Sequence, residues 1–388
     1  MRRPPPIQDW LKYPVTSGVA TLALLVTLAK LAGKDVSFLY MYSDSWHIQF
    51  WGLLTCIFPH GDPIHLIFNL YWLWVFGTLV EAVYGSFRTA GVIIFFALGS
   101  SAAEFAIFEG GIGLSGVGYG LFALLWVLSR SDERFRGAVD SQTINLFVIW
   151  FFLCIYLTYT GVWRIGNVAH GMGAVLGAIL GFCIVAEGMK RRFLEGALGL
   201  LLITNLVLAS MARDYVNRSP DKWKEFAVRG HENLQDHDYQ HAVKNLEKAV
   251  KLNRQDPDTW NLLGFAYWEL GKLEEATEAI AHAYSLRPSS NQYRQILARC
   301  KSSLAYQSQM DGKQAEAVSL YEEALALDNE NASAWYNLAL ARFQLGNTVS
   351  AKEAADHAAS LDRTNSDFQS FKEFLEKALS KPKKGTTN

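Results

Sequence analysis

The chain has 388 residues, enough for two domains, and its 36 basic and 37 acidic residues leave a formal net charge of −1. This balance gives no reason to expect nucleic acid as a partner, because nucleic-acid-binding domains carry a basic excess. Charges are sparse from residue 16 to residue 211 and dense from residue 214 onward. We therefore predict domains over residues 1–213 and 214–380, followed by a disordered tail over residues 381–388.

Apolar stretches dominate the first domain, and a helix needs about 20 mostly apolar residues to cross a bilayer. The candidates lie at approximately 16–32, 64–84, 89–108, 115–128, 144–160, 168–186 and 194–211. Arg2 and Arg3 precede the first stretch, as in a signal peptide, but no small-residue cleavage site follows it, so we expect a retained helix. We predict an all-α fold, in which a polytopic bundle of about seven helices precedes a soluble helical domain.

Basic residues in the short loops predict the orientation of the bundle. If the N-terminus is cytoplasmic, the inner loops collect most of these residues, and the outer loops hold little beyond Lys34 and Arg164. Seven crossings then put the C-terminal domain outside. We expect a multi-pass protein of a bacterial plasma (inner) membrane, in contact with membrane lipid.

The second apolar stretch opens with polar side chains. His65 and Asn69 are four residues apart and therefore share one helix face. Both can donate hydrogen bonds, and acyl transfer needs donors aimed at the oxygen that becomes negative. Two alternatives stay open: Asn69 bonds another helix while His65 anchors at the interface, or His60, Asp62 and His65 bind a metal. No His-Glu-x-x-His helix supports a metalloprotease, and we predict neither a metal nor a cofactor.

Acidic residues also occur in or beside the apolar stretches. Glu81 lies between Gly77 and Gly85, and we expect it to bond nearby backbone or the loop that contains Arg88. Glu104 and Glu109 flank the loop before the fourth stretch. We interpret both as solvated side chains at the edge of the bundle. The alternative is that they attract a basic segment of a substrate.

Ser115 opens the fourth stretch and is surrounded by glycines at positions 113, 116, 118 and 120. A hydroxyl is a weak nucleophile until a neighbouring base takes its proton. The glycines leave room for another helix and for a substrate carbonyl. Packing alone also explains serine and glycine in a membrane helix, so Ser115 needs a base to be a candidate nucleophile.

His170 supplies that candidate, because an unpaired imidazole in an apolar span is expensive. Gly173, Gly177 and Gly181 follow it at four-residue spacing, a pattern that brings two helices into backbone contact. We infer that the fourth and sixth helices pack together and bring His170 to Ser115.

Residues 45–186 resemble the rhomboid intramembrane serine proteases, because four patterns occur together in the order seen in that family. They are His65-x-x-x-Asn69, Gly77-x-x-x-Glu81-x-x-x-Gly85, Gly113-x-Ser115-Gly116 with Gly120-Leu121, and Ala169-His170 with Gly173 and Gly177. The resemblance implies cleavage of transmembrane protein substrates near the outer side of the bilayer. Substrates would enter between the second and fifth helices. The alternative is a catalytically silent rhomboid-like scaffold that binds membrane proteins.

The resemblance also implies a role for each site residue. Ser115 would be the nucleophile and His170 the base, with no third acid. His65, Asn69 and the backbone N–H of Ser115 would form the oxyanion hole. Tyr119 would stack on the His170 ring, and Gly113 and Gly116 would support the loop and helix around the nucleophile.

One position departs from that family. Trp51 is followed by Gly52, where the family often has arginine. The bracing of this loop is therefore expected to differ. Trp46, Phe50 and Trp51 still predict a surface that favours the membrane interface.

The second domain contains a 34-residue repeat. Ala242, Leu246 and Ala249 recur as Ala276, Ile280 and Ala283, and Trp260-x-x-Leu263-Gly264-x-x-Tyr267 completes a match to the tetratricopeptide repeat (TPR) pattern. We predict four repeats forming about eight helices over residues 223–379. A step of 41 residues from Leu263 to Leu304 predicts a longer helix or loop within the array.

Stacked repeats present a concave groove, so we expect a peptide or protein partner there. The alternative is a folded spacer without a ligand. The four cysteines show no paired spacing, and we interpret them as buried structural thiols.

Overall fold

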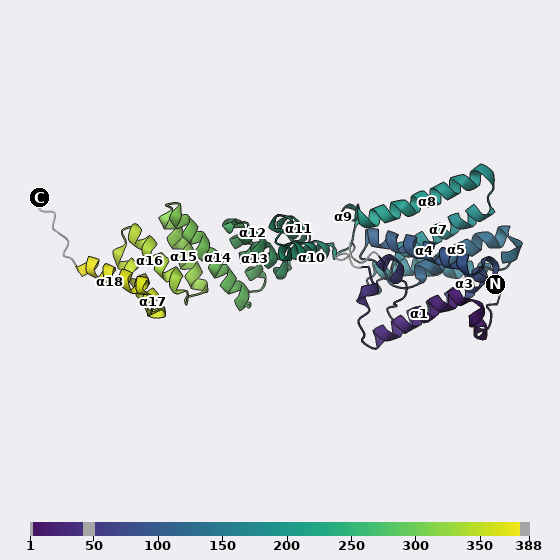
Figure 1. Cartoon of the computed structure of the whole chain (residues 1–388), viewed down its shortest axis with the longest axis horizontal. Helices are drawn as coiled ribbons and strands as arrows, with labels where there is room; N and C mark the ends of the chain where they lie inside the picture. The colour runs from purple at the N-terminus through teal and green to yellow at the C-terminus, as the bar shows by residue number, and fades with distance from the viewer. Residues whose placement is uncertain (1–2, 42–50, 381–388) are drawn as a thin grey trace. The chain divides into compact units, whose positions relative to one another are not determined.

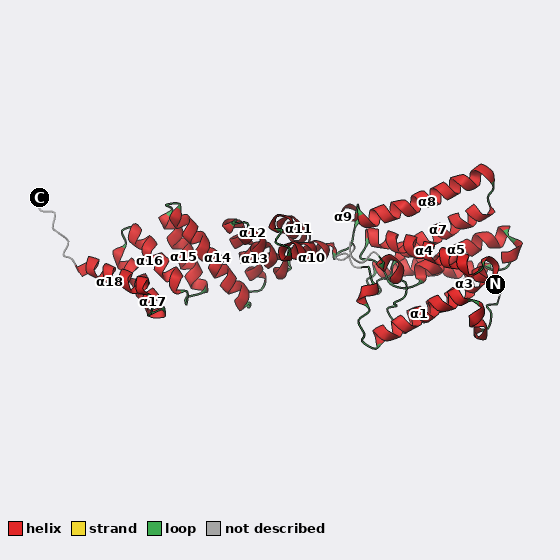
Figure 2. Ribbon diagram, viewed as in Figure 1, coloured by secondary structure: helices red, strands yellow, loops and turns green. Residues whose placement is uncertain are grey.

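The computed structural model describes residues 3–41 and 51–380, and every regular element in these ranges is a helix (Figure 2). The contacts divide the chain into two compact units, residues 1–222 and 223–388. We call them the membrane unit and the repeat unit. The expected tail at 381–388 and the aromatic residues Trp46 and Phe50 lie outside the described residues.

Within its described residues, the membrane unit contains seven long helices, all of which except α6 are labelled in Figure 1. They are α1 (Pro14–Leu31), α3 (Pro63–Tyr84), α4 (Ser86–Ile107), α5 (Ser115–Ser131), α6 (Ser141–Tyr159), α7 (Asn167–Val185) and α8 (Gly188–Ser210). Short turns complete it: η1 (Ile7–Lys12), η2 (Ser37–Leu39), α2 (Gly52–Thr55), η3 (Glu133–Phe135) and α9 (Arg213–Val216).

Six of the long helices are long and apolar enough to cross a membrane. The seventh, α5, has 17 residues, one fewer than the shortest of the six. The predicted all-α class is confirmed. The first and last of the predicted stretches, α1 and α8, both form helices long and apolar enough to cross a membrane.

Local sequence fixes where several of these helices begin and end. The Asp62 side chain accepts hydrogen bonds from the backbone N–H groups of Ile64 and His65, and Pro63 occupies the first position of α3. Gly85 ends α3 with a φ of 79°, a conformation that favours glycine. Asp140 caps α6 in the same way as Asp62 caps α3.

Helix α5 lies at the centre of the membrane unit, where it packs against α3, α4 and α7. Its residues Leu121, Leu124 and Leu125 are fully buried together with Phe96 of α4 and Leu176 of α7. In contrast, α6 and α8 keep most of their apolar side chains on the outside of the unit. Such surfaces suit hydrocarbon rather than water, whereas most residues of α5 are buried in the middle of the unit.

The repeat unit contains nine helices within its described residues. They are α10 (Lys222–Gln235), α11 (Tyr239–Leu252), α12 (Pro257–Glu269), α13 (Leu273–Leu286), α14 (Asn291–Met310), α15 (Gln314–Leu327), α16 (Ala332–Gln344), α17 (Thr348–Leu361) and α18 (Ser366–Ser380). Four pairs match the four predicted repeats. A single further helix, α18, packs on α17 and buries Phe368 and Leu375.

The irregular step in the repeat is explained by α14, whose 20 residues make it the longest helix of the unit. Small residues at the helix crossings pack as the repeat pattern requires. A Cβ atom at Gly264 would lie 2.5 Å from Ile280 Cδ1, and one at Gly230 would lie 2.5 Å from Leu246 Cγ. The first two pairs, α10–α11 and α12–α13, therefore bury a large aliphatic side chain of one helix over a glycine of its partner.

Candidate active site

Ser115 and His170 meet between α5 and α7. The Oγ atom of Ser115 is 2.7 Å from Nε2 of His170, a normal hydrogen-bond distance, although 55 positions separate the two residues. Ser115 is the first residue of α5 and is half-buried, whereas His170 is 4% exposed and lies in the first turn of α7. A hydroxyl hydrogen-bonded to an imidazole nitrogen can transfer its proton as it attacks a carbonyl.

Tyr119 lies one turn after Ser115 and stacks on the His170 ring. The ring centroids are 4.8 Å apart and the planes are inclined by 25°. The Tyr119 hydroxyl donates to the backbone oxygen of Phe147 in α6, at 3.2 Å. This bond fixes the tyrosine, and the stacked ring in turn limits rotation of the imidazole.

His65 and Asn69 lie on the inward face of α3 near the loop that precedes Ser115. A Cβ atom at Gly113 would be 2.9 Å from Cε1 and 3.1 Å from Nε2 of His65, so the imidazole packs directly on that glycine. Asn69 is buried and donates one amide hydrogen to the His65 backbone oxygen at 3.0 Å. The structure therefore places His65 against the loop before Ser115, and Asn69 lies one turn further along α3.

His60 is part of the loop support, a role that the sequence did not suggest. Its Nε2 accepts a hydrogen bond from the Leu114 backbone N–H at 3.3 Å, and its Nδ1 is 3.0 Å from the Phe58 oxygen. Burial, together with the nearby His65, lowers the pKa of His60 to about 4, so its ring is neutral near pH 7. A neutral ring with hydrogen on Nδ1 satisfies both contacts.

The same loop is bonded to the segment before α3 through its backbone. The Gly113 N–H donates to the Cys56 oxygen at 3.0 Å, and Gly113 has a φ of 111°, which an ordinary side chain would strain. Glycine at position 113 is therefore required twice, by its backbone conformation and by the His65 ring.

Gly52 has a structural reason to replace the arginine often found there. A Cβ atom at this position would lie 2.7 Å from the Tyr40 backbone oxygen and 2.7 Å from Met41 Sδ. The preceding Trp51 donates from its indole nitrogen to the Phe38 oxygen at 3.0 Å. The loop is thus braced by close backbone approach and by an indole hydrogen bond.

Glu81 accepts hydrogen bonds from the backbone, as predicted, and its donors lie both at the start of α1 and at Ser86, beside Arg88. Its carboxylate receives the N–H groups of Val15 and Thr16 at 3.0 and 2.9 Å, and the Ser86 hydroxyl at 2.8 Å. It therefore ties the start of α1 to the end of α3.

Glu104 corrects a prediction, because it is not part of a solvated edge. It is 4% exposed, and its Oε2 accepts the Ala169 N–H at 3.0 Å. The prediction treated Glu104 in the same way as Glu109, which lies five residues later and is half exposed. An acid inside an apolar stretch was itself a signal of a specific partner.

The segment after α8 returns to the loop between α4 and α5. Arg213 is 3% exposed, donates to the Phe108 oxygen at 2.8 Å, and lies 3.6 Å over the Phe105 ring. The Arg218 N–H donates to the Ile107 oxygen at 2.6 Å, and the Ser219 hydroxyl to Glu109 at 2.7 Å. These residues belong to the membrane unit and hold the loop that leads to Ser115.

All four cysteines are unpaired and buried, in agreement with the prediction of structural thiols. Within residues 3–41 and 51–380, no group of three His, Cys, Asp or Glu side chains is placed to hold a metal ion. In particular, both ring nitrogens of His60 face protein partners rather than a shared site with Asp62 and His65.

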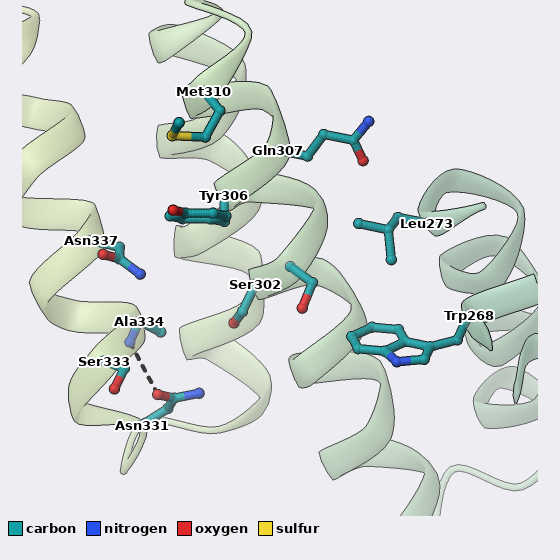
Figure 3. Close-up of a pocket in the computed structure, with 11 residues that line it drawn as sticks. Trp268, Leu273, Ser302, Tyr306, Gln307, Met310, Asn331, Ser333, Ala334 and Asn337 are labelled. Carbon is teal, nitrogen blue, oxygen red and sulfur yellow. Dashed lines mark hydrogen bonds between the residues drawn. The ribbon is translucent and has the colours of Figure 1, made fainter. Parts of the chain in front are cut away.

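The repeat unit has a groove of about 670 Å³ between α12, α14 and α16 (Figure 3). Trp268 lines one side, Tyr306 and Met310 rise from α14, and Asn337 faces them from α16. Its lining residues are aromatic, aliphatic, hydroxyl or amide side chains, with no charged group among them. The groove can therefore accept apolar side chains and hydrogen-bond a neutral backbone.

Residues 47–187 match the family described as "Rhomboid domain", and residues 210–367 match the "Cytochrome c-type biogenesis protein H TPR domain". The rhomboid protease GlpG of Serratia proteamaculans (strain 568) is 32% identical over 178 residues, covering 44% of this chain and 62% of the relative. GlpG of Yersinia pestis (strain Pestoides F) is 27% identical over 176 residues, with the same coverage. The chain thus spans about 62% of the length of these curated relatives.

Two solved TPR structures resemble the chain in part. MamA aligns with a TM-score of 0.31 and 21% identity, covering 39% of this chain and 84% of that chain. YrrB, described as a TPR protein with an unusual peptide-binding site, aligns with a TM-score of 0.31 and 17% identity, covering 48% and 92%. With its apolar helices and its two family matches, the chain is an integral membrane protein in which a region similar to the rhomboid domain precedes a region similar to a TPR domain.

Proposed function

We propose that the chain is an intramembrane serine endopeptidase of the rhomboid type, acting on transmembrane protein substrates. The observation that carries this proposal is the 2.7 Å contact between Ser115 Oγ and His170 Nε2 inside an apolar helix bundle. Packing alone would not need a serine and a histidine to meet there. The match to the rhomboid domain and the similarity to GlpG support the same reaction class.

In the proposed reaction, Ser115 attacks the scissile carbonyl while His170 takes the hydroxyl proton at Nε2. The protonated His170 then gives that proton to the leaving amine, and water hydrolyses the acyl-enzyme by the same route. Ser115 is the first residue of α5, where backbone N–H groups have no partner within the helix. Its N–H, with the side chains of His65 and Asn69, would stabilise the negative oxygen.

Substrates would enter sideways, between α3 and α6. Aromatic side chains of the two helices meet here. The ring centroids of Phe68 and Trp150 are 5.3 Å apart, and those of Trp72 and Phe147 are 4.8 Å apart. A substrate helix must unwind locally to expose a peptide carbonyl, because an intact helix bonds its own carbonyl groups. We therefore expect substrates with weak transmembrane helices.

Cleavage would occur near the outer side of a bacterial plasma membrane, with the N-terminus in the cytoplasm and the TPR domain outside. The distribution of basic residues supports this orientation. The hydrogen bond from Arg213 to Phe108 supports one part of this arrangement, because it joins the end of the seventh long helix to the loop before Ser115 and so puts both on the same side of the bundle. The uncharged groove around Tyr306 and Asn337 would recruit a substrate or partner through a neutral, extended peptide segment.

A fluorophosphonate probe tests the proposal, because it reacts only with an activated serine. We expect labelling of the detergent-solubilised wild type, no labelling of Ser115→Ala, and loss of cleavage of a model transmembrane substrate by that variant. A folded wild type that is neither labelled nor active would instead favour the silent membrane-protein-binding scaffold.

A further inference from the structure

We propose that Glu104 is a positioning residue for the His170 base, because it caps the helix that carries this histidine. The inference rests on the proposed hydrolase function. It adds a third side chain to the Ser115 and His170 pair, one that touches neither the hydroxyl nor the imidazole but determines where the imidazole lies.

Helix α7 begins without a cap of its own. Its N-cap residue is Gly166, which has no side chain to accept a hydrogen bond, whereas α3 and α6 are capped by Asp62 and Asp140. The first N–H groups of a helix have no partner within it and need an acceptor from elsewhere. His170 is the fourth residue of α7, so its position depends on this uncapped first turn.

Glu104 of α4 supplies the missing acceptor from 65 positions away. Its Oε2 receives the Ala169 N–H at 3.0 Å. The positive end of the helix dipole also favours an acceptor at this position. The buried Glu104 carboxyl oxygen and the Ala169 N–H therefore satisfy each other.

Glu104 lies between the turn that precedes the His170 helix and the loop that precedes Ser115. A Cβ atom at Gly166 would lie 3.4 Å from Glu104 Cδ, and one at Gly111 would lie 3.7 Å from Glu104 Cγ. Gly111 belongs to the loop before Ser115, and Gly166 to the turn before His170. One side chain thus packs against both segments that present the candidate catalytic groups.

Ala169 is held from its other side as well. A Cβ atom at Gly116 would lie 3.4 Å from the Ala169 oxygen, so the Ala169 backbone lies between Glu104 on its N–H side and the helix of Ser115 on its carbonyl side. Losing the Glu104 bond would free the first turn of α7 to shift. Displacements of about 1 Å at a reacting group can slow catalysis about 100-fold.

The experiment compares Glu104→Gln and Glu104→Ala with Asp140→Ala in the full chain. Asp140 caps α6 with a carboxylate bonded to the Thr143 N–H and hydroxyl, at 2.8 and 2.7 Å. Asp140 lies at the opposite end of α6 from Thr158, whose hydroxyl is bonded to Asn167 at the start of α7. Its loss should therefore destabilise a helix of the same unit at the end away from His170. Each variant is assayed for the rate of fluorophosphonate labelling and for kcat and KM with one model transmembrane substrate. All rates are normalised to the folded fraction measured by thermal denaturation.

We expect Glu104→Ala to lower the labelling rate and kcat by about 100-fold with little change in KM, and Asp140→Ala to leave the normalised rates near those of the wild type. Glu104→Gln keeps an acceptor oxygen but loses the charge, and should lower the rates by about tenfold. Equal normalised rates for the Glu104 variants and the wild type would overturn the positioning role. An unlabelled wild type would instead overturn the hydrolase function itself.

Discussion

Gly173 of α7 lies against the backbone carbonyl of Gly116 in α5, so closely that a Cβ atom at Gly173 would overlap that oxygen. Gly177 and Gly120 repeat this contact one turn further along the same pair of helices. We call this row of contacts the glycine seam. Ser115 and His170 lie at the end of the seam where α5 and α7 begin. Their 2.7 Å separation therefore depends on helices that touch backbone to backbone.

Replacing Gly173 by alanine should push α7 away from α5. We expect the variant to lose about 1–3 kcal/mol of stability, a typical effect of overpacking, and most of its fluorophosphonate labelling. Gly199→Ala in α8 is the matched control, because nothing lies within 4 Å of a Cβ atom there. Thermal denaturation and labelling of both variants in detergent test the seam. Wild-type labelling by a folded Gly173→Ala would contradict its importance.

Acid should destabilise the loop before Ser115 through His60. The pKa of His60 is lowered from 6.5 to about 4 by burial, so between these values the unfolded chain binds a proton that the folded chain does not. Stability is therefore lost as the pH falls from 6.5 to 4, by about 3 kcal/mol at most from this group.

Denaturation midpoints at pH 7.5 and pH 4.5 measure this effect. His60→Gln cannot take up the proton, and its midpoint should change less between the two pH values than that of the wild type. The same change in both proteins would mean that His60 does not sense acid.

Residues 213–222, which we call the connector, should support the loop before Ser115 even when the repeat unit is removed. A chain ending at Lys222 retains Arg213 and Ser219 and should be labelled at close to the wild-type rate. A chain ending at Ala212 loses the bonds to Phe108 and Glu109 and should be labelled about tenfold more slowly, because the loop before Ser115 is less well positioned.

A pair of point variants separates the connector's side chains from its backbone. Arg213→Gln should reproduce part of the loss, whereas Arg218→Gln should not, since Arg218 bonds Ile107 through its backbone N–H. Indistinguishable labelling of these two variants would remove Arg213 from the support of the loop.

The repeat groove should affect natural substrates more than model ones. Tyr306→Ala with Asn337→Asp removes an aromatic surface and adds charge to an uncharged groove. We expect unchanged cleavage of a model transmembrane substrate in detergent, but fewer Ser115-dependent new N-termini in the membrane proteome. Equal sets of products from this variant and the wild type would favour a spacer role for the repeats.

The sequence alone determined the helices and the residue types of the site. Apolar stretches and 34-residue spacing are local, periodic patterns, so the seven long helices of the membrane unit and the four repeats were predicted, although α8 begins six residues before the predicted stretch and the short α2 was missed. Ser115 and His170 could be singled out because polar groups within apolar spans need partners.

Only the tertiary structure decided which partners those polar groups found. The bonds from Ala169 to Glu104 and from Arg213 to Phe108 join residues 65 and 105 positions apart. No sequence period encodes such contacts, because they depend on how closely helices pack and on which buried N–H or carbonyl remains unsatisfied. The same reason explains why Glu104 resembled a solvated acid in the sequence but lies buried beneath the first turn of the His170 helix.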